Sequence, residues 1–232
     1  MSAAPIKVLL VDDHAVVREG YRLLLEKHEG LRVVGEAASA AAAYQYYKET
    51  RPDVVVMDIS MPGRGGIDAV EHIRGLDSKA RVLVFTMHGS VPYILQAFRA
   101  GAKGYITKSS PPELLVAAVR KVAAGLLAIC PETSEALALH QLQGERGGLE
   151  NLSPREFEIF RMLLDARSTD EIAAALNLSR KTAANYHYSI KSKLGVASDI
   201  ELVHLGLRQG LLAPVAPPDG GRFAQGIKRD PP

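Results

Sequence analysis

The sequence predicts a doubly wound α/β domain with a five-stranded parallel sheet, followed by a smaller all-α domain. Two observations favour this fold class. Over residues 1–125, short apolar runs rich in Val, Leu and Ile alternate with segments of helical character. Such alternation is typical of βαβ units, in which helices cover both faces of a parallel sheet. Over residues 151–212, four helix-start signals follow one another with no strand pattern between them. A chain of 232 residues is long enough for two domains.

The apolar runs of the first domain predict strands at residues 6–11, 31–35, 54–57, 82–85 and 104–107. The segments between them predict helices at residues 15–28, 39–50, 67–75, 91–101 and 112–124. We expect the alanine-rich stretch 37–43 to belong to the second helix, because alanine has the highest helix propensity.

The pattern changes after the first domain. Residues 126–150 are predicted to form a linker, because proline and glycines interrupt them and only residues 134–143 have helical character. Residues 213–232 are rich in Pro and Gly and show no periodicity, so we expect this tail to be disordered.

Serines mark the helix starts of residues 151–212. Ser153, Ser168 and Ser198 are each followed three positions later by glutamate, which is the pattern of a capping box. Ser179 can cap a further helix, and glycines follow the last two helices. Four short helices within this stretch predict a compact all-α domain.

Composition excludes several classes of protein. Hydrophobic residues make up 47% and charged residues 23%, which is the balance of a globular protein. No apolar run approaches the ~18 residues of a membrane helix, and the first residues lack the layout of a signal peptide, so we expect a cytoplasmic protein that does not bind membranes. The single Cys130 excludes an intramolecular disulfide framework and a multi-cysteine zinc site. A net charge of +2 means that nucleic-acid binding would require a local basic patch.

Polar side chains follow four of the predicted strands. Asp12 and Asp13 end the first strand, Asp58 the third, Thr86 the fourth and Lys108 the fifth. In an open parallel sheet, ligands bind beyond the carboxyl ends of the strands. We therefore expect three carboxylates, a hydroxyl and an ammonium group to meet at one edge of the sheet.

These groups predict a metal-assisted phosphoryl acceptor. Clustered carboxylates repel one another unless a cation joins them, and hard oxygen ligands suit Mg²⁺ or Mn²⁺. Lysine binds phosphate as a point charge, and an aspartate carboxylate can act as a nucleophile that forms an aspartyl-phosphate. Asp58 is the central candidate, with Asp12 and Asp13 as metal ligands. The sequence contains no Gly-x-x-x-x-Gly-Lys loop, which excludes a P-loop nucleotide site.

The motifs that carry these residues resemble the receiver domain of two-component response regulators, a flavodoxin/CheY-like fold, over residues 6–125. They are Val11-Asp12-Asp13-His14, Met57-Asp58-Ile59-Ser60-Met61-Pro62-Gly63, Phe85-Thr86 and Gly104-Tyr105-Ile106-Thr107-Lys108.

The resemblance implies that a sensor histidine kinase phosphorylates Asp58. It also implies that Asp13 and the Ser60 backbone carbonyl bind the metal, with Asp12 acting mostly through water. Lys108 and Thr86 would contact the phosphoryl group.

Two further residues of these motifs are weaker candidates for a functional role. Tyr105 matches the aromatic switch position of receivers, whose ring changes packing when the threonine moves; an ordinary core role is the alternative. His14 is expected to open a helix and not to bind metal.

The second domain contains a predicted helix-turn-helix, with helices at 170–176 and 179–194 around a turn at 177–178. The second helix holds four basic residues and no acidic one, and is expected to enter the major groove of double-stranded DNA. Its apolar residues at 3-4-4 spacing predict the buried face; they are Ala183, Tyr186, Ile190 and Leu194. The expected DNA-contacting residues are Arg180, Lys181, Asn185, His187, Tyr188, Lys191 and Lys193. From the helix alone, a solvated charged face is as good an interpretation as a DNA-binding face.

The flanking motifs resemble the LuxR-type helix-turn-helix of the NarL/FixJ group over about residues 151–212. They are Leu152-Ser153-Pro154-Arg155-Glu156, Glu171-Ile172-Ala173, Leu178-Ser179-x-Lys181-Thr182 and Lys193-Leu194-Gly195. Ala183 and Ala184 depart from the family pattern, which usually has valine and then a polar or basic residue. The Tyr186-x-Tyr188 pattern is similar to the GacA/UvrY branch.

The two resemblances together imply a transcription regulator that binds promoter DNA and forms a homodimer on phosphorylation, with RNA polymerase as a candidate partner. They also imply that the unphosphorylated receiver covers the recognition helix. Acidic residues of the linker offer a complementary surface for that helix: Glu132, Glu135, Glu145 and Glu150.

Two alternatives stay open at this stage. One is a regulator of the same architecture that works without phosphorylation, or through protein partners alone. The other is a metal-dependent phosphatase on a similar sheet, which would need a catalytic acid or base beside Asp58 and a substrate pocket. The sequence indicates neither feature, so we predict that the chain is not an enzyme.

Overall fold

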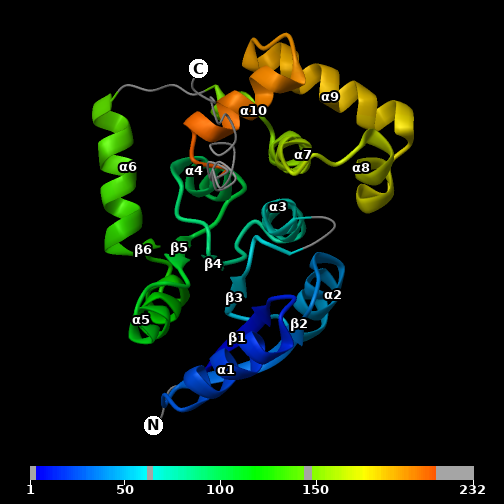
Figure 1. Ribbon diagram of the computed structural model, residues 1–232. Helices are drawn as coiled ribbons and strands as arrows, with labels where there is room; N and C mark the ends of the chain where they lie inside the picture. The colour runs from blue at the N-terminus through cyan, green and yellow to red at the C-terminus, as the bar shows by residue number, and fades with distance from the viewer. Residues whose placement is uncertain (1–3, 62–64, 144–147, 213–232) are drawn as a thin grey trace, which may run out of the picture.

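A computed structural model describes residues 4–61, 65–143 and 148–212. Its sheet is fully parallel, with strands in the order β2-β1-β3-β4-β5-β6 (Figure 1). The strands are β1 (Ile6–Val11), β2 (Leu31–Ala37), β3 (Val54–Met57), β4 (Val82–Thr86), β5 (Gly104–Thr107) and β6 (Ala128–Ile129). The predicted doubly wound α/β fold is therefore confirmed, and the two-residue β6 extends the five expected strands.

Five helices connect the strands and cover both faces of the sheet. They are α1 (Ala15–Glu26), α2 (Ala40–Thr50), α3 (Gly66–Leu76), α4 (Val91–Arg99) and α5 (Pro112–Ala123). Successive side chains of a strand point to opposite faces, so each strand contributes to two cores. Val8 and Leu10 pack with α1 and α5, whereas Leu9 and Val11 pack with α2, α3 and α4.

The start of the second helix differs from the prediction. β2 continues to Ala37, which pairs with Val11, and α2 begins only at Ala40. Ser39 precedes this helix, and its side chain accepts a hydrogen bond from the N–H of Ala42. Pairing in the sheet and the serine cap thus outweigh the helix propensity of the alanine run.

The linker also holds more structure than the sequence predicts. β6 adds to the edge of the sheet beside β5, and α6 (Pro131–Gln143) starts three residues before the expected helix at 134. Proline suits the first position of a helix because the N–H that it lacks would have no partner there. The predicted disordered tail, 213–232, lies outside the described residues.

The second domain is all-α, as predicted. It comprises η1 (Leu149–Asn151), α7 (Pro154–Leu164), α8 (Thr169–Leu176), α9 (Arg180–Leu194) and α10 (Asp199–Arg208). Ser153 and Ser168 form complete capping boxes, and Ser179 caps α9. Ser198 caps α10, but the Glu201 carboxylate accepts a hydrogen bond from the N–H of Ala197, so this capping box is incomplete.

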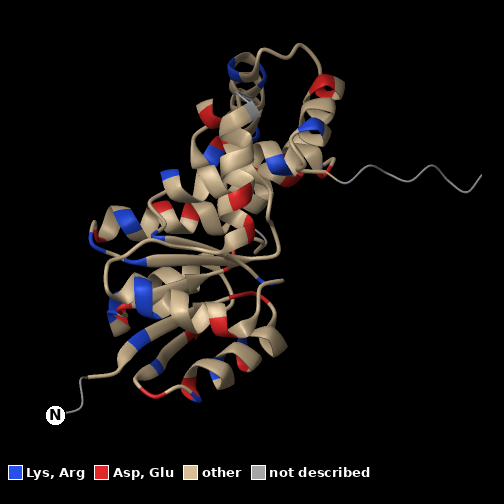
Figure 2. Cartoon of the chain, turned by 90° about the vertical axis from the view of Figure 1, so that its left-hand side faces the viewer, with Lys and Arg blue, Asp and Glu red and all other residues tan. Residues whose placement is uncertain are grey.

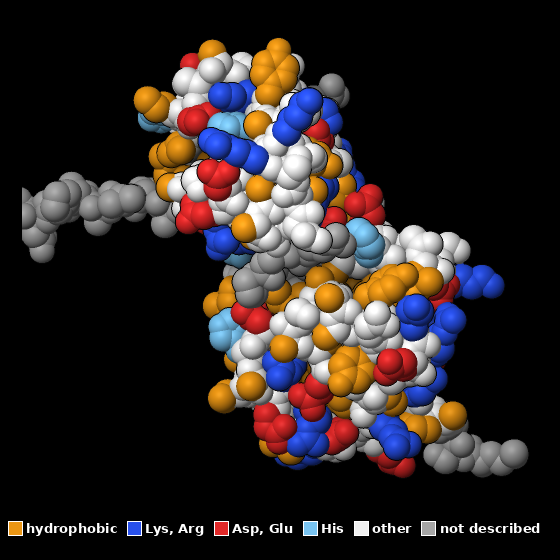
Figure 3. All heavy atoms as spheres, turned by 90° about the vertical axis from the view of Figure 1, so that its right-hand side faces the viewer, with side chains coloured by type: hydrophobic (Ala, Val, Ile, Leu, Met, Phe, Trp, Pro, Cys, Tyr) orange, Lys and Arg blue, Asp and Glu red, His pale blue; other side chains and the backbone are white. Residues whose placement is uncertain are grey.

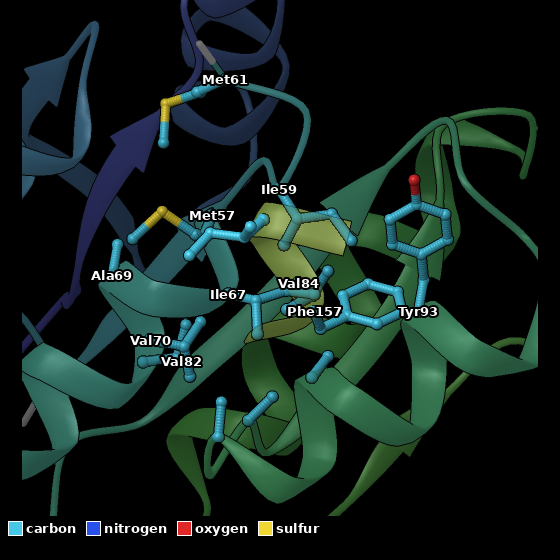
Figure 4. Packing of buried hydrophobic residues seen from close by; sticks show 14 of the residues in the cluster. Met57, Ile59, Met61, Ile67, Ala69, Val70, Val82, Val84, Tyr93 and Phe157 are labelled. Carbon is cyan, nitrogen blue, oxygen red and sulfur yellow. The ribbon is translucent and has the colours of Figure 1, made fainter. Parts of the chain in front are cut away.

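The all-α domain packs onto the α3–α4 side of the sheet through α7. One continuous apolar cluster joins the two domains, with Ile67 and Tyr93 on one side and Phe157 and Phe160 on the other. Figure 4 shows Phe157 beside Tyr93 and close to Ile67 and Val84. Charged residues of both signs are interspersed over both domains (Figure 2). Within the part of the chain that is described, no helix is long and apolar enough to cross a bilayer.

Candidate functional site

The phosphoacceptor candidate Asp58 lies at the carboxyl end of β3 and is 2% exposed. Its Oδ1 accepts a hydrogen bond from the N–H of Ser60 at 2.9 Å, and its Oδ2 lies 2.6 Å from Lys108 Nζ. Lys108 Nζ is also 2.5 Å from Asp12 Oδ2. The ammonium group therefore bridges the carboxylates that follow β1 and β3, and the expected cluster forms at this edge of the sheet.

The environment of this pair favours its charged form. Burial alone would raise the pKa of Asp58, but the hydrogen bonds from Lys108 and Ser60 and the charge of Lys108 lower it below its ordinary value. Burial would likewise lower the pKa of Lys108, but Asp12 and Asp58 raise it above its ordinary value. At neutral pH Asp58 is thus a carboxylate, which is the form that can act as a nucleophile.

Asp12, Asp13 and His14 place one ligand atom each within 4.8 Å of one another. Asp13 Oδ1 is buried and has no hydrogen-bond partner among the described residues. His14 Nδ1 lies 2.9 Å from it, in a geometry that does not make a hydrogen bond. A buried carboxylate oxygen without a donor is costly unless a cation lies near it, so the carboxylates of Asp12 and Asp13 fit a divalent metal ion. His14 is the N-cap residue of α1, at the helix start as predicted.

A hydroxyl pair connects Asp58 to the neighbouring strand β4. The Ser60 and Thr86 side-chain oxygens are 3.1 Å apart, and Thr86 is fully buried. Tyr105, also fully buried, donates a hydrogen bond from its hydroxyl to the His88 carbonyl at 2.7 Å. Burial raises the pKa of Tyr105 well above its ordinary value, so this hydroxyl stays protonated. His88 had no signal in the sequence, since it lies in the turn after β4 and outside every motif.

The outward face of α9 is open to solvent. Lys181, Asn185 and Tyr188 are exposed, Tyr188 to 76%. Ala183 and Ile190 are buried, and Tyr186 and Leu194 are partly buried, which matches the predicted inner face.

Most of the basic groups of α9 meet carboxylates from other helices. Arg180 Nε lies 3.2 Å from Asp170, and Lys193 Nζ lies 2.6 Å from Glu156. Asp199 Oδ1 is shared by His187 Nε2 at 2.7 Å and Lys191 Nζ at 3.2 Å. Figure 3 shows blue and red side chains next to each other on this domain, which is the upper one. Among the described residues, Lys181 is the α9 cation that makes no ion pair.

Glu156 fastens α9 to α7. Besides Lys193, its carboxylate accepts hydrogen bonds from the N–H of Ser153 at 2.9 Å and the hydroxyl of Ser189 at 3.1 Å. Burial alone would raise the pKa of Glu156, but Lys193 and the serine donors lower it below its ordinary value of 4.5. Glu156 is buried, so this network contributes to the stability of the domain.

We expect Glu156→Gln to lower the free energy of unfolding at pH 7 by about 2 kcal/mol, because hydrogen bonds to a charged group are lost. A lowered pKa means that this contribution is complete above the ordinary pKa of 4.5 and is lost as the pH falls below it through the folded-state pKa. Urea unfolding at pH 7 and pH 3 measures the difference between the proteins, which should shrink at the lower pH. Glu171→Gln, in the exposed capping box of α8, is the matched control and should cost less.

The expected cover over the recognition helix is not found. The α/β domain contacts α7 and η1, and the outward residues of α9 stay exposed. Figure 1 places α6, which carries Glu132 and Glu135, on the opposite side of the molecule from α9. Neither these residues nor Glu150 makes an ion pair with α9 among the described residues, and Glu145 lies outside them. The acidic partner surface of α9 comes from α7, α8 and α10 instead.

Comparisons with known proteins agree with this architecture. Residues 8–120 match the response regulator receiver domain, and residues 150–205 match the bacterial regulatory proteins of the luxR family. Response regulator UvrY from Escherichia coli (strain K12) is 39% identical over 208 residues, which cover 89% of this chain and 95% of UvrY. Response regulator GacA from Pseudomonas aeruginosa is 38% identical over 209 residues, which cover 89% of this chain and 98% of GacA.

Two solved structures are similar as well. A LuxR-family two-component response regulator from Aurantimonas sp. SI85-9A1 is 50% identical, with a TM-score of 0.59, over 60% of this chain and 99% of its own. RcsB from Salmonella enterica serovar Typhimurium, bound to promoter rprA in the presence of phosphomimetic BeF3-, is 27% identical, with a TM-score of 0.68, over 87% of this chain and 98% of its own.

Proposed function

The chain belongs to the two-component response regulators with a LuxR-type DNA-binding domain, and on this premise we propose that phosphorylation of Asp58 controls its binding to promoter DNA. The α/β domain is the receiver and the all-α domain is the DNA-binding domain. The observation that carries the proposal is the cluster at the sheet edge, where buried Asp58 shares the Lys108 ammonium group with Asp12.

The chain's own residues supply most of the phosphoryl-transfer chemistry. Asp58 is held as a carboxylate whose oxygen attacks the phosphorus, and the bond from phosphorus to the donor nitrogen of a sensor histidine kinase breaks. Lys108, already at Asp58, neutralises the negative charge that the phosphoryl group brings. Mg²⁺ (or Mn²⁺), when bound by Asp12, Asp13, Asp58 and the Ser60 carbonyl, supplies further positive charge for the phosphoryl oxygens.

Thr86 lies close enough to Asp58 to respond to a phosphoryl group on it. Its hydroxyl now lies against the Ser60 hydroxyl, and moving it toward a phosphoryl oxygen would pull the end of β4. The turn after β4 carries His88, whose carbonyl anchors the Tyr105 hydroxyl. We infer that Thr86 and Tyr105 act together as a two-state element that phosphorylation shifts.

Intact-mass measurement after incubation with acetyl phosphate and Mg²⁺ tests this function. One added phosphoryl group on the wild-type protein, absent without the metal, is the expected result. An unlabelled protein that still binds promoter DNA would favour the phosphorylation-independent regulator.

For the DNA-facing residues, we expect Lys181→Ala to reduce the slope of log affinity against log salt by about 0.9, the loss of one phosphate contact. Lys193→Ala should change the slope less, because Lys193 Nζ is already paired with Glu156 at 2.6 Å. Asn185→Ala should relax sequence preference instead, since amide side chains read base edges. Fluorescence anisotropy on a promoter fragment at several salt concentrations measures these slopes. Equal slopes for the two lysine variants would contradict the difference expected between Lys181 and Lys193. Slopes equal to that of the wild-type protein would indicate that this face of α9 is solvated and does not contact DNA.

The partners follow from the same sites. A sensor histidine kinase would supply the phosphoryl group, and double-stranded promoter DNA would meet the outward face of α9. RcsB, a structural relative bound to promoter rprA, supports promoter DNA as a partner. Homodimerisation on phosphorylation and contact with RNA polymerase complete the proposed set of interactions.

A further inference from the structure

The DNA-binding domain meets the receiver through α7, and polar contacts at this interface are well buried. Gln96 of α4 is 1% exposed and donates hydrogen bonds from Nε2 to the carbonyls of Leu149 at 2.8 Å and Leu152 at 3.1 Å. Arg155 Nη1 of α7 lies 3.8 Å from Asp68 Oδ2 of α3. These directional contacts fix how the two domains are oriented at their interface.

One contact of α7 reaches the segment that follows the phosphoacceptor. Glu158 is 2% exposed and forms an ion pair with Arg161 at 2.8 Å. Its carboxylate lies against Gly65, the N-cap residue of α3, so closely that a methyl group on Gly65 would be 2.2 Å from Glu158 Oε2. Only glycine fits between α3 and this side chain without displacement.

The next residue lies directly on the backbone of Asp58. A methyl group on Gly66 would be 2.2 Å from the Asp58 carbonyl oxygen and 2.5 Å from Ile59 Cα. Glu158, the two glycines and the Asp58 backbone therefore form one continuous line of contacts. Close packing of this kind can transmit a displacement from one contact to the next.

A second line of contacts starts at Thr86. The N–H of His88 lies 3.4 Å from Thr86 Oγ1, and the His88 ring stacks on Tyr93 with centroids 4.1 Å apart. Tyr93 meets Phe157 of α7 edge to face, with ring centroids 5.3 Å apart; Figure 4 shows the two rings beside each other. The segment after Asp58 and the turn after β4 thus both contact the same helix of the DNA-binding domain.

We propose that Glu158 is a positioning residue for phosphoryl transfer: from the DNA-binding domain it holds Gly65, Gly66 and the Asp58 backbone in the unphosphorylated arrangement, and so slows phosphate uptake. This inference rests on the proposed function of Asp58. Coupling between two sites is reciprocal, so phosphorylation weakens the docking of α7 as much as docking disfavours the phosphorylated state.

The test uses the full-length protein and its rate of phosphoryl uptake from acetyl phosphate with Mg²⁺, over a range of donor concentrations. Gly65→Ala places a methyl group against Glu158, and Gln96→Ala removes the donor of two interface hydrogen bonds. Each variant should raise the rate at saturating donor several-fold, with little change in the donor concentration at half-maximal rate. Small-angle scattering should show a larger radius of gyration for both variants than for the wild-type protein, because their domains dock less tightly.

Three further variants separate positioning from a general loss of structure. Glu158→Asp shortens the side chain, so adding it to Gly65→Ala should restore the slow uptake. Gly66→Ala presses on Asp58 itself and should lower the rate. Arg99→Ala, on the exposed side of α4, should leave it unchanged.

An unchanged or lower rate in either Gly65→Ala or Gln96→Ala overturns the inference, whatever the scattering shows. A wild-type protein that takes up no phosphate contradicts the proposed function of Asp58 instead, so the two failures are distinguishable.

Discussion

Asp58→Asn is expected to abolish phosphate uptake from acetyl phosphate and from a cognate kinase, the largest single effect we predict. The amide has nearly the shape of the carboxylate and can still accept the hydrogen bond from Ser60, but it is not a nucleophile at phosphorus. It also removes the negative charge that holds Lys108 at this edge of the sheet. Intact-mass measurement with acetyl phosphate and Mg²⁺ should show no added phosphoryl group.

A matched change at a surface carboxylate controls for this result. Glu71→Gln makes the same chemical substitution on the exposed side of α3 and should leave uptake at the wild-type level. Circular dichroism should show that both variants are folded. A stable label on the Asp58→Asn protein would overturn the assignment of the phosphoacceptor.

The sheet and its functional edge could be predicted because both depend on local signals. Short apolar runs marked the strands, and Asp12, Asp58 and Lys108 each follow a strand directly, so the topology alone brings them together. β6 gave no such signal, since two residues are too few to show a period. Its pairing with β5 depends on the neighbouring strand and not on its own sequence.

The charge state of α9 could not be predicted from the helix itself. The segment contains no acidic residue, and that observation favoured a free basic patch. Its ion-pair partners Glu156, Asp170 and Asp199 come from three other helices, and only the packing of these helices brings them to α9. The sequence pattern identifies Glu156 only as half of a capping box, although its carboxylate also binds Lys193.

Docking between the domains had no sequence signal for a related reason. Tyr93 and Phe157 are apolar residues of helices, and periodicity does not say which apolar face of a helix is covered by its own domain and which by another. Glutamate is a residue type that is mostly exposed, yet Glu158 is almost fully buried against Gly65. Only the packing of the two domains distinguishes these residues from their neighbours.

Phosphorylation should tighten binding to DNA with two half-sites by about 10²-fold, but should change binding to a single half-site little. The outward residues of α9 are already exposed in the docked arrangement, so one domain can meet one half-site without prior release. A dimer gains far more, because its second domain binds at a high effective concentration. α10 offers a surface for such a dimer: Ile200, Val203 and Leu207 recur at helical spacing, and Ile200 is 70% exposed.

Gel-shift titration of the full-length protein, with and without acetyl phosphate, at one salt concentration measures both effects. The phosphorylated protein should bind paired half-sites with a Hill slope above one, whereas Asp58→Asn should behave as the unphosphorylated protein does. Ile200→Glu should remove the gain on paired half-sites and leave binding to one half-site intact, because a charge at the dimer surface opposes association without touching α9. Tyr46→Glu, at a partly exposed aromatic residue of α2, is the control and should keep the gain. A phosphorylation effect of equal size on single and paired half-sites would mean that release of a covered α9, and not dimerisation, carries the signal.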